Sequence, residues 1–189
     1  MNDKHYRVLV DANVAYTYVS GREDLFAEPV NQIMKLCASG KIDGFLAFHS
    51  VSIIWYLLRK AREDQRRRMM MELCELLTVK GASHDEIIQA IQKEEFKDFE
   101  DCLQDKCAKE AGCDFIVTVN VKDFAHSEVP AITPDQMMER MNAKAMTANE
   151  TQIQKASSEV APAEKKQIFI GQISNSHGAD HEQDGAKQV

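Results

Sequence analysis

The sequence of 189 residues is long enough for one domain with an appendage, and its 44% hydrophobic content is enough to form a buried core. A formal net charge of −7 excludes a protein that holds nucleic acid through its overall charge. The five cysteines form no CxxC pair, which argues against a disulfide framework or a structural zinc site. The polar N-terminus does not resemble a secretory signal, and no stretch approaches the roughly 18 apolar residues of a membrane span. We therefore expect a cytoplasmic protein.

Strands and helices alternate along the first part of the chain. The apolar run at residues 6–10 predicts a buried parallel strand, and residues 14–19 and 29–39 predict helices. A second strand is expected at residues 44–48. Ser50 is a suitable N-cap for the long apolar helix that follows it.

The same alternation continues towards the C-terminus. Apolar spacing and turn residues predict helices at residues 63–77, 85–93, 96–111 and 134–141, and strands at 78–80, 114–119 and 131–133. Strands that alternate with helices imply an α/β fold, in which a mostly parallel sheet is covered by helices on both faces. Ligands of such sheets bind outside the carboxyl ends of the strands, so we look for the chemistry there.

The composition changes near residue 142. Residues 142–189 are dominated by Ala, Gln, Ser, Asn, Lys and Glu, which predicts a low-complexity tail, disordered or marginally helical, after a domain at residues 1–141. The segment QIFIGQI at residues 167–173 is strand-like. It either docks onto the domain or a partner, or has no role.

Two groups of acids and amides are candidates for a site. Asp11 ends the first predicted strand, and Asn13 follows it, although an Asx turn or helix cap is the simpler explanation of these two residues taken alone. Asp98, Asp101 and Asp105 are spaced by three and four residues, which places them on one stripe of a predicted helix. Such a stripe suits either a solvated face or a bound cation.

A third group decides between these alternatives. Asn120 and Asp123 follow the buried strand predicted at residues 114–119, so they also belong to the carboxyl edge of the sheet. Three separate segments then bring oxygen ligands to one region, and Mg²⁺ and Mn²⁺ prefer such ligands. The sequence therefore favours a divalent-metal site.

Three segments resemble the PIN domain (the PilT N-terminus family), which includes the toxin nucleases of bacterial toxin–antitoxin pairs. They are VLVDAN, DFEDCLQDKCAKEAGCDFIVTVNVKDF and ITPDQMM. The most specific part is DFED followed by an apolar helix and then by IVTVN and KDF. The resemblance spans about residues 7–141. It implies a PIN-like α/β/α sandwich.

The resemblance also implies roles for particular residues. Asp11, Asp101 and Asp123 correspond to the acids that hold divalent metal in similar proteins, with Asn120 close by. Asp98 occupies a neighbouring polar position and is expected to support the site, as is Asn13, named above. The activity implied is metal-assisted cleavage of RNA with Mg²⁺ or Mn²⁺.

The sequence departs from the family at one position. Many family nucleases carry a Glu in the helix after the second strand, whereas this chain has Ile53 and Ile54 in that stretch. The nearest polar residues are His49, Ser50 and Ser52. A ribonuclease toxin is the first functional hypothesis. A catalytically weak or inactive module that binds RNA or a protein partner is the second, and a different metal-dependent phosphohydrolase is the third.

A basic segment interrupts this acidic chain. Its sequence, RKAREDQRRR, predicts contact with RNA or with an acidic partner, but an exposed helix with internal ion pairs explains it too. The candidate RNA-binding residues are Arg59, Lys60, Arg62, Arg66, Arg67 and Arg68. The adjoining residues 69–71 are all Met and cannot all face a core, so some apolar surface is expected for a homodimer or an antitoxin.

Overall fold

The computed structural model describes residues 5–159, except the side chains of residue 148 and of residues 155–159. The described residues contain a sheet of five parallel strands in the order β3-β2-β1-β4-β5. The strands are β1 (Tyr6–Val10), β2 (Ile42–Ala47), β3 (Thr78–Lys80), β4 (Phe115–Val117) and β5 (Ala131–Ile132). The predicted parallel α/β fold is confirmed.

Strand β1 lies at the centre of the sheet because its side chains are apolar on both faces. Val8, Leu9 and Val10 are completely buried, as expected for a strand covered by helices on both sides. Leu9 pairs with Phe45 of β2 on one side and with Ile116 of β4 on the other. The carboxyl end of β1 is therefore flanked by two neighbouring strand ends.

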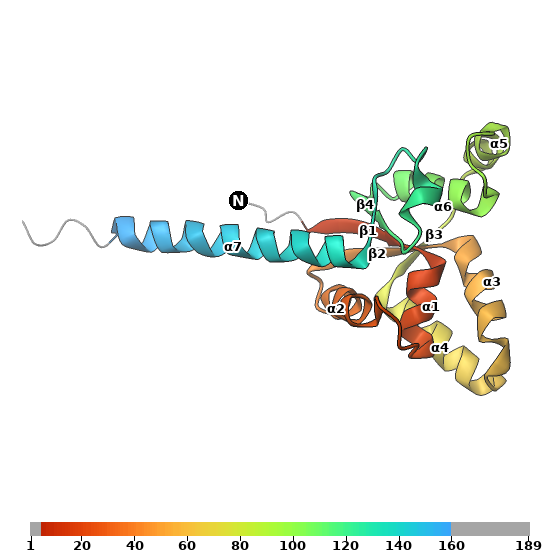
Figure 1. Ribbon diagram of the computed structural model, residues 1–189, viewed down its shortest axis with the longest axis horizontal. Coiled ribbons are helices and arrows are strands. Elements are labelled where there is room, and N and C mark those ends of the chain that lie inside the picture. The colour runs from red at the N-terminus through yellow and green to blue at the C-terminus, as the bar shows by residue number, and fades with distance from the viewer. Residues whose placement is uncertain (1–4, 160–189) are drawn as a thin grey trace, which may run out of the picture. The chain divides into compact units, whose positions relative to one another are not determined.

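Helices cover both faces of this sheet (Figure 1). They are α1 (Ala12–Ser20), α2 (Ala27–Ala38), α3 (Phe48–Leu57), α4 (Glu63–Leu76), α5 (His84–Gln92), α6 (Phe99–Glu110) and α7 (Pro134–Glu159), with 3-10 turns η1 (Leu58–Lys60) and η2 (Val121–Phe124). Figure 1 shows α5 and α6 on one side of the sheet and α1, α2 and α4 on the other.

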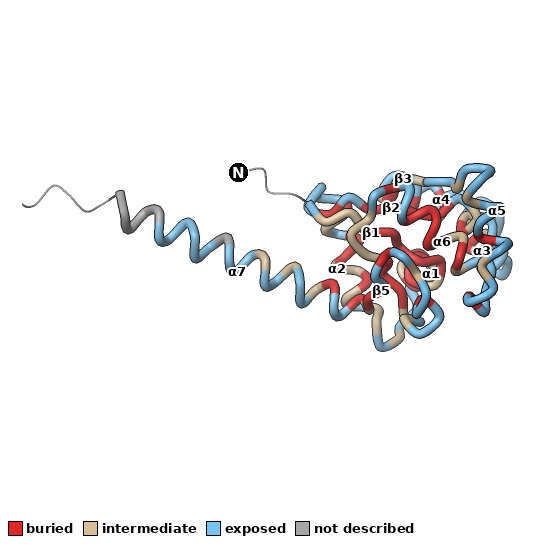
Figure 2. The backbone as a smooth tube through the Cα atoms, turned by 90° about the horizontal axis from the view of Figure 1, so that it is seen from above, coloured by how far each residue is buried: buried red, intermediate tan, exposed pale blue. Residues whose placement is uncertain are grey.

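Alternating side chains of β1 enter two different cores. Val8 and Val10 pack in the larger cluster, which includes residues of α1, α2 and α4. Leu9 packs in a second cluster with Cys107 and Ala108 of α6. This alternation follows from the two-residue period of a strand. Figure 2 shows the buried residues concentrated in and around the sheet.

Several predicted boundaries differ from the structure. Helix α6 begins at Phe99 rather than at residue 96, because Asp98 has extended backbone and caps the helix by accepting a hydrogen bond from the N–H of Glu100 at 2.8 Å. The prediction that Ser50 is an N-cap was wrong. Helix α3 begins at Phe48, and Ser50 is completely buried in its first turn.

The last described helix is longer than predicted. Helix α7 runs from Pro134 to Glu159, whereas the apolar spacing predicted its end near Met141. The chain separates into two compact units at Met1–Lys144 and Ala145–Val189, so α7 begins in the first unit and continues into the second. The segment at residues 167–173 lies outside the described residues. Among residues 5–159, no helix has both the length and the apolar character needed to cross a membrane.

Candidate active site

Asp11 lies at the carboxyl end of β1 and is almost completely buried. Its carboxylate accepts hydrogen bonds from Thr118 Oγ1 at 2.7 Å and from Gln104 Nε2 at 2.8 Å. Burial raises the pKa of Asp11, and the two side-chain donors oppose that rise. Sequence reasoning missed both partners. Gln104 is one helical turn after Asp101, so that spacing was the available clue.

Asp101 faces the same region from the first turn of α6. Its pKa is raised to about 7, first by burial and then by the charges of Asp11, Asp98, Asp123 and Glu100. Like charges shift a carboxyl pKa upwards only when they lie close to it. Asp101 therefore lies within range of the charges of the predicted acids from β1 and from the segment after β4.

The segment after β4 is connected to Asp11 through Thr118. The Thr118 hydroxyl donates to Asp11 and accepts a hydrogen bond from the backbone N–H of Asn120 at 3.0 Å. Asn120 precedes η2, and its backbone carbonyl accepts a hydrogen bond from the N–H of Asp123 at 3.0 Å. Both Asn120 and Asp123 are exposed, so their side chains are accessible from solvent.

The predicted acidic stripe of α6 divides in the structure. Asp98 and Asp101 lie at the start of the helix, and the charges of Asp11 and Asp98 both act on Asp101. Asp105 points elsewhere. It is completely buried and accepts hydrogen bonds from the backbone N–H groups of Glu128 and Val129. The expectation that one face of the helix presents all three acids together was wrong, because the chain after η2 covers Asp105.

Two residues that hydrogen-bond to Asp11, Asn13 through its backbone and Gln104 through its side chain, each have a second polar atom without a partner in the described part of the chain. Asn13 Oδ1 and Gln104 Oε1 are buried and accept no hydrogen bond among the described residues. Unsatisfied buried acceptors require an explanation, and a cation or its water ligands would supply one. The described residues hold no preformed group of three His, Cys, Asp or Glu side chains arranged to bind a metal. The available donors are oxygens, which suit a hard divalent cation.

The first turn of α3 brings an imidazole to the acidic group. The Nε2 atom of His49 lies 3.1 Å from the backbone carbonyl oxygen of Glu100. Burial lowers the pKa of His49, while Glu100 and Asp11 oppose this effect. By contrast, Ile54 is completely buried in the core. In the stretch where the family resemblance led us to expect a Glu, His49 is thus a polar residue that borders the acids.

The basic segment occupies η1 and α4, after the C-terminal end of α3. The Arg66 guanidinium stacks over Trp55 at 3.7 Å from the ring centroid and also donates to the Trp55 carbonyl oxygen at 2.6 Å. Arg59 stacks over Tyr56 at 4.3 Å. These contacts hold two of the predicted RNA-binding side chains against aromatic rings.

Other members of the basic segment form ion pairs within α4. Arg67 pairs with Glu63 at 2.6 Å, and Arg68 pairs with Asp64 at 2.9 Å, each four residues apart. Arg62 also approaches Asp64 at 3.5 Å. The alternative prediction of intrahelical ion pairs is therefore confirmed for Arg67 and Arg68 of α4. A role of the basic segment in RNA binding remains a proposal.

The adjoining methionines divide between core and surface. Met70 is buried, Met69 is partly buried, and Met71 has 61% of its surface exposed. The prediction that some apolar surface remains is confirmed.

Comparison with known proteins agrees with this architecture. The PIN domain family matches residues 7–122, which is more than half of the chain. Ribonuclease VapC1 of Aquifex aeolicus (strain VF5) is 27% identical over 140 residues, covering 72% of this chain and 96% of that protein.

Two solved structures share the fold. VapBC2 from Rickettsia felis, bound to a DNA fragment from its promoter, has a TM-score of 0.52 at 14% identity, covering 67% of this chain and 98% of that one. PAE2754 from Pyrobaculum aerophilum has a TM-score of 0.51 at 17% identity, covering 74% and 99%. Together with the five-stranded parallel sheet, the sequence match establishes that this chain belongs to the PIN domain family.

Proposed function

We propose that this protein is a metal-dependent endoribonuclease that uses Mg²⁺ or Mn²⁺. The observation that carries the proposal is the environment of Asp101, whose pKa is raised by burial and by four neighbouring carboxylates. Keeping these charges together is unfavourable without a cation, and a divalent ion would turn their repulsion into attraction. Asp11, Asp101 and Asp123 are the proposed ligands, with Asn120 as a further oxygen donor.

The relatives support the biological class. The curated relative is called a ribonuclease, and the Rickettsia felis structure is that of a VapBC complex. We therefore propose that this protein is the toxin of a toxin–antitoxin pair, with an antitoxin protein as its partner. The exposed Met71 contributes apolar surface for such a partner or for a second copy of the chain.

The side chains of this chain have distinct tasks in the proposed reaction. When bound, a divalent cation supplies activation of water and stabilisation of charge on the scissile phosphate. Gln104 and Thr118 hold the Asp11 carboxylate in one orientation from two sides. Asp101 and Asp123 contribute negative charge from α6 and η2. His49 fixes the first turn of α6 through the Glu100 carbonyl group and so keeps Asp101 beside Asp11.

RNA binding requires positive charge in addition to this acidic site. The segment with Arg59 and Lys60 supplies it, since phosphates bind clustered bases through charge and counterion release. The supporting roles proposed for Asp98 and Asn13 are different. Asp98 caps α6 and adds to the negative field around Asp101, and Asn13 has an unpartnered side-chain oxygen beside Asp11.

Cleavage of RNA by the purified protein in Mn²⁺ tests the proposal. Asp11→Asn and Asp101→Asn should each reduce the rate at least a hundredfold, whereas Asp85→Asn on α5, outside the acidic group, should match the wild type. Equal cleavage by all four proteins would show that the activity belongs to a contaminant. If the wild type binds RNA without cleaving it, the second hypothesis, an inactive binding module, would be supported instead. The lack of a Glu near Ile53 would then explain the missing activity.

A further inference from the structure

The chain after η2 has little regular structure of its own. Residues 125–130 connect η2, which carries Asp123, to the two-residue strand β5. Phe124 and Val129 are buried at the two ends of this connection, in the core cluster that contains Leu9 and Ile116. Between these anchors, the connection needs polar contacts to fix its conformation, because it has no neighbouring strand to pair with.

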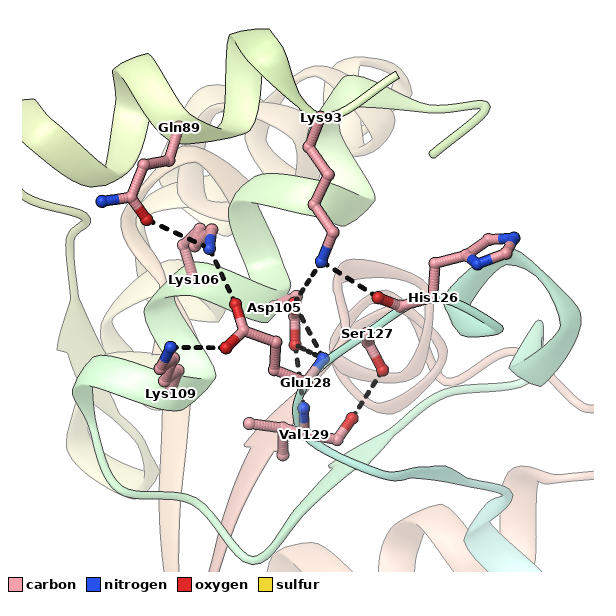
Figure 3. Close-up of polar contacts among 9 residues, drawn as sticks. All are labelled: Gln89, Lys93, Asp105, Lys106, Lys109, His126, Ser127, Glu128 and Val129. Atoms are coloured by element: carbon pink, nitrogen blue, oxygen red, sulfur yellow. Dashed lines mark hydrogen bonds and ion pairs between the residues drawn. The ribbon is translucent and has the colours of Figure 1, made fainter. Parts of the chain in front are cut away.

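Asp105 of α6 supplies these contacts (Figure 3). Its carboxylate accepts the backbone N–H of Glu128 at 2.9 and 3.0 Å and the backbone N–H of Val129 at 3.0 Å. The Asp105 side chain is completely buried, and Lys93 Nζ lies 3.8 Å away. A buried carboxylate is unfavourable unless hydrogen bonds and a counter-charge compensate it, and here the compensating donors come from one loop.

Neighbouring side chains strengthen the same connection (Figure 3). The Glu128 carboxylate binds Lys106 at 2.8 Å and also pairs with Lys109. Lys93 donates to the backbone carbonyl oxygen of His126 at 3.0 Å. Residues 126, 128 and 129 are thus all attached to α6 or to the end of α5.

Asp105 occupies a particular place relative to the acidic site. It lies four residues after Asp101 on the rigid frame of α6, so the two carboxylates are about one helical turn apart along the helix. On its N-terminal side, the loop that Asp105 holds is joined directly to η2, which carries Asp123. The helix and the loop together therefore set the position of Asp123 relative to Asp101.

We infer that Asp105 is a positioning residue for the acidic site, because it fixes the loop that carries Asp123 against the helix that carries Asp101. The Asp105 carboxylate is completely buried, so its proposed effect on the site is indirect. It acts through the backbone of Glu128 and Val129. This inference rests on the proposed function, in which Asp101 and Asp123 hold one cation. A purely structural role would stabilise the fold without affecting cation affinity.

The test compares the full-length wild type with Asp105→Asn and Asp105→Ala. The Asn variant keeps one acceptor oxygen and the shape of the side chain, so it remains informative if the Ala variant fails to fold. Ile33→Val, in the core cluster that excludes Phe124 and Val129, is the control for lost stability. Three quantities are measured: the Mn²⁺ dissociation constant by electron paramagnetic resonance without RNA, amide hydrogen exchange of residues 120–130, and thermal unfolding.

The expected result is a rise of about tenfold or more in the Mn²⁺ dissociation constant, with faster exchange of residues 120–130, in the Asp105 variants. The Ala variant should show the larger change. Ile33→Val should unfold at a lower temperature but keep the wild-type Mn²⁺ affinity. Unchanged Mn²⁺ affinity in the Asp105 variants would overturn the inference, whether or not the loop loosens.

The same measurements separate the inference from the proposed function. A wild type that binds Mn²⁺ but does not cleave RNA would refute the proposed ribonuclease activity. The Mn²⁺ affinities of the Asp105 variants would still decide the inference about Asp105. A wild type that does not bind Mn²⁺ would overturn both.

Discussion

Gln104 on α6 donates a hydrogen bond of 2.8 Å to Asp11, although 93 residues separate the two in sequence. The other side-chain oxygen of Gln104 is buried without a partner. One side chain thus orients the central carboxylate of the site and presents a free acceptor beside it. Helix α6 contributes to this site through Gln104 as well as through Asp101.

Replacing this donor tests its part in the proposed reaction. Gln104→Met keeps the approximate size of the side chain but cannot donate to Asp11. The hydrogen bond from Gln104 stabilises the ionised carboxylate of Asp11. Its loss should therefore raise the pKa of Asp11 further. The RNA cleavage rate should fall about tenfold to a hundredfold, and the acidic limb of the pH–rate profile should move to higher pH.

Gln32→Met, an exchange on α2, is the matched control and should keep the wild-type profile. Thermal unfolding should show little loss of stability in Gln104→Met, because an unsatisfied buried oxygen is also removed. An unchanged pH–rate profile would refute the role assigned to Gln104.

Neutralising Asp101 should stabilise the metal-free protein. The pKa of Asp101 is raised from 3.8 to about 7 in the folded state, so the folded protein binds more protons than the unfolded chain between these pH values. Its ionisation therefore destabilises the fold increasingly as the pH rises through this window. With EDTA at pH 8, Asp101→Asn should increase the free energy of unfolding by about 1 kcal/mol, after allowance for solvent screening.

Urea unfolding at pH 8 and at pH 4 measures this effect. The gain should largely disappear at pH 4, where Asp101 is protonated in the folded protein. Glu94→Gln, at an exposed neighbouring acid, controls for the general loss of negative charge. A variant less stable than the wild type at both pH values would contradict the unfavourable charge assigned to Asp101.

The ion pairs of Glu128 should have the opposite pH dependence. Hydrogen bonds and charges from Lys106 and Lys109 lower the pKa of Glu128 to about 2. A lowered pKa gives stability that is complete above the unfolded pKa near 4.5 and is lost as the pH falls towards 2. Glu128→Gln should therefore cost about 0.5–1 kcal/mol at pH 7, since 39% of the Glu128 side-chain surface is exposed and solvent screens its ion pairs.

The same variant should differ little from the wild type at pH 2.5 in urea unfolding. Glu139→Gln, at an exposed acid on α7, is the control. A loss of stability that is as large at pH 2.5 as at pH 7 would indicate altered packing rather than broken ion pairs.

The salt dependence of RNA binding tests the basic segment. Lys60 is exposed on η1, whereas Arg67 is paired with Glu63 on α4. If Lys60 contacts one phosphate, Lys60→Ala should reduce the slope of log K against log salt by about 0.7, the value for one charge on a single strand. Arg67→Ala should have a smaller effect because its charge is already compensated. The measurement is fluorescence anisotropy with a labelled RNA and the cleavage-deficient Asp11→Asn protein, and equal slopes for all variants would exclude this surface.

Truncation tests the division of the chain near α7. Ending the chain after Lys144 should change the unfolding temperature little, because that position closes the first compact unit. Met137→Ala in the full-length protein should cost about 2–5 kcal/mol, since Met137 is completely buried in the larger core. Thermal unfolding of both proteins provides the measurement. A large loss on truncation would move the domain boundary towards the C-terminus.

The sequence was most informative where local chemistry determines structure. The short apolar run that ends in Asp11 is typical of a buried parallel strand, so the place of that carboxylate at a strand end could be predicted. The start of α5 is local in the same way, because the reciprocal capping bonds of Ser83 and Glu86 join residues only three apart in sequence. These features need no knowledge of the rest of the fold.

Long-range contacts could not be predicted in the same way. Asp105 has the spacing of a fellow ligand of Asp101, but its partners lie more than 20 residues later. Gln104 likewise looked like an ordinary helical residue until β1 was placed beside α6. Helix α7 was predicted too short because its exposed, polar C-terminal part has no apolar period, although its Ala, Gln and Glu residues favour helix.

The sheet topology determines how late in synthesis the acidic site can form. Strand β1 is made first but pairs with β4, and Asp11 receives its hydroxyl donor from Thr118, 107 residues later. A nascent chain therefore cannot complete the acidic site until most of the domain has left the exit tunnel. In a protein proposed to cleave RNA, the site would therefore stay incomplete while most of the chain is still being translated.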